Sequence, residues 1–159
     1  MLNRLILLAA LLLPVGLAHA HQFQVGELEI AHPWSQELPP NAPTVAAYFV
    51  IENKGKTADR LLGVDSPIAT LAELHEHVKH NDLMKMQPVS SVDIAPGQTI
   101  TFAPMAYHVM LLNLTDRSLL SDGKRFPLTL HFEKAGPVTV NVAVQKNAPD
   151  GHKTPTHAH

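Results

Sequence analysis

Two histidines and two methionines of this chain stand at spacings that would allow them to bind one metal ion together. His75, Met86, His108 and Met110 follow the pattern H-x10-M-x21-H-x-M. A thioether is a soft, neutral donor that suits monovalent copper, whereas zinc, calcium and magnesium favour thiolate, imidazole or oxygen ligands. If the four side chains converge, they predict a Cu(I) site, and copper handling as the function.

The methionines of the chain are clustered rather than spread. One of the five is the initiator, three of the other four lie in two segments that also hold four histidines, and the fourth, Met105, is three residues before His108. These residues are Met84, Met86, Met105 and Met110, with His75, His77, His80 and His108. A lone Met in a β protein usually fills the core, and a lone His at its rim is usually solvated. The clustering is hard to explain by packing and favours a role as ligands.

Strand periodicity makes the convergence plausible but leaves the choice of ligands open. His108 and Met110 are two residues apart on an expected strand, so their side chains share a face. Residues 78–82 form a polar connection that would bring His75 and Met86 level in a hairpin.

The same periodicity gives alternative candidate ligands. Met84 shares a face with Met86, and His77 shares a face with His75, so spacing alone does not choose between the members of each pair. Met105, three residues before His108, is a weaker candidate.

Short segments with β-branched and aromatic residues, separated by Pro- and Gly-containing turns, must position these side chains. The expected strands are 23–30, 44–52, 60–64, 71–77, 83–89, 99–102, 107–114, 128–133 and 138–145. Such spacing is typical of an antiparallel β-sandwich or barrel. Residues 119–123 would hold one helical turn at most. No internal repeat or domain boundary interrupts 21–146, which we expect to be a single domain.

The two ends of the chain differ from this domain. Residues 1–20 have a basic start, an apolar run and an Ala-x-Ala ending, which predict a secretory signal cleaved after Ala20 and no stable membrane insertion afterwards. Residues 147–159 contain His152, His157 and His159 but no large apolar side chain, and we expect a disordered tail able to bind metal.

Composition excludes several classes of protein. The formal charge is −2 with 12 basic and 14 acidic residues, and loss of Arg4 with the signal would make it −3 (11 against 14). The basic residues are scattered, so we expect no nucleic-acid partner. The chain has no cysteine, which excludes a disulfide scaffold and a blue-copper centre with its thiolate ligand. Hydrolase motifs such as G-x-S-x-G and H-E-x-x-H do not occur.

The four-residue pattern resembles the signature of the PCu(A)C family of periplasmic copper chaperones. The surrounding sequence agrees, notably Ala31-His32-Pro33-Trp34, Glu73-Leu74-His75-Glu76 and Tyr107-His108-Val109-Met110-Leu111. The resemblance covers about residues 21–144. It departs at Met105-Ala106, where the family usually has Gly-Gly, so that Met105 either adopts a positive φ at some cost or avoids it.

The resemblance implies a fold, a ligand set and partners. The fold would be a cupredoxin-like, Greek-key antiparallel β-sandwich that binds one Cu(I) through His75, Met86, His108 and Met110. The partners would be the CuA-containing subunit of cytochrome c oxidase and Sco-type proteins, in a Gram-negative periplasm. A His-containing tail in this family often assists with Cu(II). We expect a monomeric carrier without catalytic activity.

Two alternatives remain. Cleavage after Ala20 would leave His21 with a free amine and an imidazole, half of a histidine brace for Cu(II), in an enzyme or a scavenger that needs a second His. Few exposed aromatic residues are available for a substrate face, which disfavours the enzyme. A structural sandwich with incidental His and Met would show no stabilisation by metal, whereas a carrier gains about 2.7 kcal/mol at ligand a hundredfold above Kd.

Overall fold

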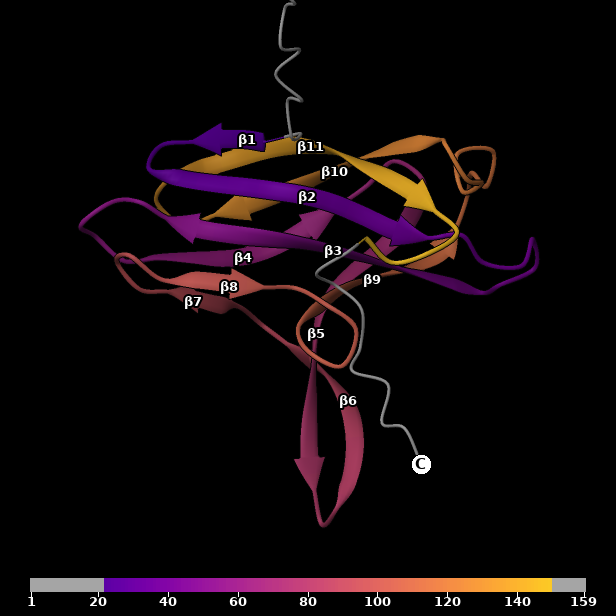
Figure 1. Cartoon of the computed structure of the whole chain (residues 1–159), viewed down its shortest axis with the longest axis horizontal. Coiled ribbons are helices and arrows are strands. Elements are labelled where there is room, and N and C mark those ends of the chain that lie inside the picture. Colours follow the sequence, from indigo (N-terminus) through magenta and orange to yellow (C-terminus); the bar gives the residue numbers. More distant parts are fainter. Residues whose placement is uncertain (1–21, 150–159) are drawn as a thin grey trace, which may run out of the picture.

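The computed structural model describes residues 22–149 as an all-β fold of eleven strands (Figure 1). The strands are β1 (Gln22–Val25), β2 (Leu28–Gln36), β3 (Thr44–Asn53), β4 (Asp59–Asp65), β5 (Ala69–His80), β6 (Leu83–Val89), β7 (Val92–Ile94), β8 (Thr99–Thr101), β9 (His108–Leu114), β10 (Arg125–Phe132) and β11 (Gly136–Gln145). These residues include no helix that is long and apolar enough to cross a membrane. The predicted signal 1–20, His21 and most of the predicted tail, 150–159, lie outside the described residues.

The strands form one sheet in the order β6-β5-β9-β3-β2-β11-β10-β4-β7, with β1 paired to β2 and β8 to β3. The all-β prediction is confirmed, and among the described strands every pairing but one is antiparallel, as expected. The sheet is mixed, because β2 and β11 pair in parallel from Trp34↔Ala143 to Gln36↔Gln145. Parallel neighbours cannot be joined by a tight hairpin, and here nearly the whole domain forms the connection between them.

One hydrophobic core fills the inside of this curved sheet. In β3 the side chains alternate, and Val45, Ala47, Phe49 and Ile51 are all buried. Alternate residues of a strand point to opposite faces, so a half-buried strand buries every second side chain. The Phe49 and Phe102 rings stack with centroids 4.4 Å apart, which ties the turn after β8 to the core.

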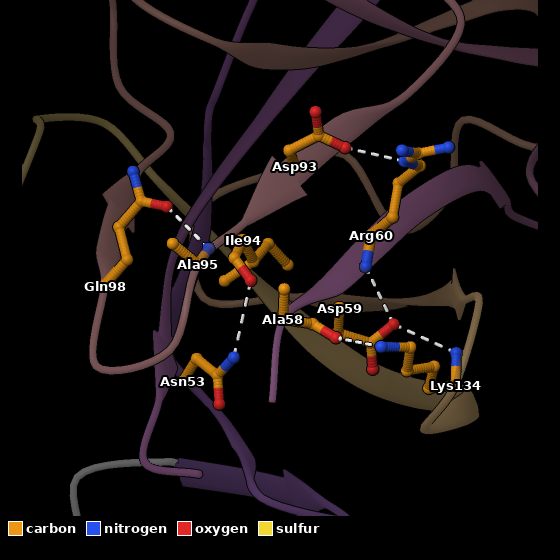
Figure 2. Close-up of polar contacts among 9 residues, drawn as sticks. All are labelled: Asn53, Ala58, Asp59, Arg60, Asp93, Ile94, Ala95, Gln98 and Lys134. Atoms are coloured by element: carbon orange, nitrogen blue, oxygen red, sulfur yellow. Dashed lines mark hydrogen bonds and ion pairs between the residues drawn. The ribbon is translucent and has the colours of Figure 1, made fainter. Parts of the chain in front are cut away.

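Two buried polar side chains join separate elements at one end of the fold (Figure 2). Asn53 donates a hydrogen bond from Nδ2 to the carbonyl of Ile94 in β7. The Asp59 carboxylate accepts from the backbone N–H groups of Arg60 and Lys134, at 2.7 and 2.9 Å. The fold itself satisfies both side chains, and we assign this cluster a structural role.

The structure differs from the expected strands at two places. The segment 23–30 is two strands rather than one, because Gly26 adopts φ +55° and reverses the chain between β1 and β2. The strand β7 was not predicted, since three residues are too few to show a period. Residues 119–123 form turns, within the limit of one helical turn that we expected.

The hairpin of β5 and β6 extends away from the body of the sheet (Figure 1). All residues of β6 except Val89 are exposed, while β5 continues inward to pair with β9. The inner end of β5 is therefore the point where hairpin and body meet.

Candidate metal centre

Strands β5, β6 and β9 carry all four predicted ligands on a single face. In the antiparallel ladders His75 pairs with His108, and His77 pairs with Met86. Directly paired residues point to the same side of a sheet. Met110, two positions after His108, therefore lies on this face as well.

The opposite face of these strands belongs to the core. Leu74, Val109 and Leu111 alternate with the candidate ligands and are buried. The hydrophobic alternation of β5 and β9 thus determines which way the histidines and methionines point.

His108 and Met86 make the closest contact of the group. The Nε2 atom of His108 lies 2.9 Å from the Sδ atom of Met86. The His75 ring is also near, with its centroid 5.5 Å from that of His108. A metal–imidazole bond of about 2.0 Å places the ion roughly 3.2 Å from the ring centre, so two imidazoles on one tetrahedral ion have centres roughly 5 Å apart. The separation of the two rings fits a shared ion.

Hydrogen bonding and burial favour the neutral form of the His108 ring, which can bind a metal ion through a ring nitrogen. Its side chain is only 3% exposed, and Nδ1 lies 3.3 Å from the carbonyl oxygen of Ala106. A proton on Nδ1 is donated to that carbonyl, which leaves the lone pair on Nε2, beside Met86. Burial lowers the pKa of His108, the Ala106 carbonyl acts in the opposite direction, and His77 and His75 lower the pKa further.

A carboxylate that our sequence interpretation missed orients the His75 ring. Its Nε2 lies 2.7 Å from Oε2 of Glu73, while its Nδ1 is buried and, among the described residues, has no hydrogen-bond partner. A carboxylate that accepts from one ring nitrogen fixes the tautomer and leaves the other nitrogen as the donor atom. The Glu-x-His spacing on a strand could have revealed this pair, because residues i and i+2 share a face.

Three of the candidate methionines are about half exposed. Met86 and Met84 are 50% and 47% exposed on the hairpin, and Met84 is opposite Lys79 near its outer end. Met105 is 48% exposed and adopts φ +67°. The chain therefore keeps the positive φ that a glycine would favour, although a methionine stands there.

Nitrogen and oxygen ligands alone do not form a site in this arrangement. Within residues 22–149, no group of three or more His, Asp or Glu side chains is placed to hold a metal ion. The orphaned Nδ1 of His75 and the paired His108 and Met86 instead offer a mixed set of imidazole and thioether donors. Such a set fits Cu(I), which accepts both donor types.

Solved PCuAC domains are similar to this chain in structure. The copper-bound PCuAC domain from PmoF2 matches with a TM-score of 0.68 and 28% identity, over 80% of this chain and 99% of that one. The apo PCuAC domain from PmoF1 matches with a TM-score of 0.67 and 32% identity, over 81% and 100%. The solution structure of CuI-DR1885 from Deinococcus radiodurans matches with a TM-score of 0.56 and 28% identity, over 82% and 84%.

These likenesses define the class as that of PCuAC-type domains with a cupredoxin-like β fold, which confirms the resemblance seen in the sequence. The chain belongs to the family described as "Putative lipoprotein LpqE-like", whose model matches residues 28–144. A curated relative, "Putative lipoprotein Lxx21020" of Leifsonia xyli subsp. xyli (strain CTCB07), is 32% identical over 111 residues. That match covers 68% of this chain and 66% of the relative, just under two thirds of its length.

Proposed function

We propose that this protein is an exported copper carrier that binds one Cu(I) through His75, Met86, His108 and Met110. The observation that carries the proposal is the 2.9 Å contact between the His108 Nε2 and Met86 Sδ atoms, which join an imidazole and a thioether at one point. The buried Nδ1 of His75, which has no hydrogen-bond partner within residues 22–149, supports it. The likeness to a copper-bound PCuAC domain and to CuI-DR1885 adds support from relatives.

The position of the ligands suits capture and release rather than catalysis. Met86 belongs to an exposed hairpin strand and is half exposed, whereas His108 is buried in the body. A recipient can approach the thioether side and replace Met86 first, while the histidines still hold the cargo. Neutral thioethers are weakly held ligands of a soft ion, so the copper ion should leave the site from this side.

The recipient and the compartment are proposed from the family resemblance. We propose transfer towards the CuA centre of cytochrome c oxidase, alongside Sco-type proteins, in the periplasm. The predicted signal 1–20 and the lipoprotein family match support export.

A Cu(I) competition titration tests the carrier function. The chain from residue 21, with the three tail histidines replaced by Gln, should bind one tight equivalent. The variant Met86→Leu/Met110→Leu, which keeps the side-chain volume, should lose that affinity. Equal Cu(I) binding by both proteins would contradict the two-thioether site.

A Cu(II) site at the N-terminus is a second candidate, and one observation favours it. The β1–β2 ladder reaches Gln22↔Ala31, and the next residue of β2 is His32, which is exposed. We propose His32 as the second imidazole that a brace built on His21 would need. Cu(II) binding that is lost in His32→Gln but kept in Met86→Leu would support this site.

A further inference from the structure

His77 is a third imidazole beside the copper site. It lies two residues after His75 on the same face of β5 and pairs with Met86 across the hairpin. Its ring centroid is 5.2 Å from that of His108, with the ring planes nearly perpendicular. Its Nδ1 is buried and, within the described residues, has no hydrogen-bond partner.

The geometry of His77 relative to His108 is as suitable for a shared ion as that of His75. The two ring separations, 5.2 and 5.5 Å, both match the roughly 5 Å between imidazoles bound to one tetrahedral metal. His108 lies near both of the other rings and is the common member of the two pairs.

A third imidazole matters most for divalent copper. Cu(II) favours nitrogen and oxygen ligands, whereas thioethers suit Cu(I). We infer that His77 gives this centre a Cu(II)-binding mode, in which His75, His77 and His108 bind the ion and the Met86 thioether does not. This inference rests on the proposed function, because it concerns the same centre.

The side chain of His77 must turn to complete this set. In the described conformation, three imidazoles are not yet arranged around one point. His77 is in the outer part of β5, beyond its pairing with β9, where β6 is the neighbouring strand and is exposed. A side chain on a projecting two-stranded hairpin can change rotamer without disturbing the core.

His80 supplies a matched control. It is on the same strand as His77, at the end of the hairpin, and is exposed. Its position, three residues later, puts it on the opposite face of β5. Replacing His80 removes an imidazole of the hairpin without removing one from the centre.

The test compares His77→Gln with His80→Gln in the chain from residue 21. The background carries Gln at His21, His32, His152, His157 and His159, which removes the other imidazoles proposed above as Cu(II) ligands. Each protein is titrated separately with Cu(II) and with Cu(I), and the Cu(II) forms are examined by electron paramagnetic resonance. We expect His77→Gln to weaken Cu(II) binding by at least about tenfold, since even a residue that only orients a ligand is typically worth that much. It should also remove one nitrogen from the hyperfine pattern.

The Cu(I) titration separates this inference from the proposed function. His77→Gln should change Cu(I) affinity little, and His80→Gln should change neither affinity. Unchanged Cu(II) binding in His77→Gln, or an equal loss for both ions, overturns the inference. Absence of Cu(I) binding in the background protein instead overturns the proposed function, and a Cu(II) affinity that still depends on His77 would then define a Cu(II) site.

Discussion

Met86 Sδ lies 2.9 Å from His108 Nε2, although their strands are not neighbours in the sheet. Strand β5 lies between β6 and β9, and both side chains project from the same face to meet above it. The contact joins the exposed hairpin to the buried body. It places the thioether on the accessible side of the imidazole.

This contact predicts that Cu(I) binding depends on the sulfur of Met86 and not on that of Met84. Met86→Leu keeps the volume but removes the donor, and we expect Cu(I) affinity to fall at least about tenfold. Met84→Leu is the control, because Met84 shares the strand and face but is nearer the hairpin tip. Competition titration with a Cu(I) chelator measures both. A larger loss in Met84→Leu would show that the neighbouring methionine is the ligand.

The carboxylate of Glu73 should act through His75. Glu73→Gln replaces the carboxylate that holds Nε2 with a neutral amide, which is a weaker acceptor, and we expect Cu(I) affinity to fall about 10- to 100-fold. The nitrogen chemical shifts of His75 should also show a changed tautomer balance. Glu76→Gln serves as the control, because Glu76 faces away and bonds Gln87 instead. An unchanged His75 spectrum in Glu73→Gln would contradict the positioning role.

The backbone conformation of Met105 should lower the free energy of unfolding. A non-glycine residue at φ +67° is strained by roughly 1–2 kcal/mol, and glycine recovers part of this despite its larger loss of entropy on folding. We expect Met105→Gly to raise the free energy of unfolding by about 0.5–1 kcal/mol in urea denaturation.

Ala106→Gly is the matched control for Met105. Ala106 does not have a positive φ, so glycine there should destabilise the fold. Cu(I) affinity should stay unchanged in Met105→Gly. If it falls, the Met105 thioether contributes to the site.

Burial of His108 predicts a pH dependence of stability. Burial, together with His77 and His75, lowers the pKa of His108 against the opposing effect of the Ala106 carbonyl. The unfolded chain therefore binds more protons, with a His pKa of about 6.5. The contribution of His108 to the free energy of unfolding is complete above the unfolded-state pKa of about 6.5. It is lost as the pH falls from there to the lowered pKa of His108 in the folded protein.

Urea denaturation of the metal-free protein between pH 8 and pH 5 measures this effect. His108→Gln should lose less stability over that interval than the unchanged protein. His75, His77 and Glu73 face the same centre and remain in both proteins, so the difference isolates His108. Identical pH profiles would contradict the prediction.

The sequence predicted the parts of this site that depend on local periodicity. The alternation of β9 puts His108 and Met110 on one face, and that of β5 does the same for His75 and His77. The β5–β6 hairpin was predicted, but its turn is residues 81–82 rather than 78–82, and His77 rather than His75 is level with Met86. These relationships need only the two-residue repeat of an extended backbone.

The sequence could not predict relationships that depend on pairing between distant strands. That β5 pairs with both β6 and β9, that β2 and β11 run in parallel, and that His108 is buried follow from the register of the complete sheet. The position of His77 beside His108 also emerges there, whereas the Glu73–His75 contact lies within one strand and could have been predicted. The sequence by itself determined which donor atoms the chain can offer and which of them share a strand face. Only the tertiary structure decided which donors meet, because packing of one core fixes the register of all strands together.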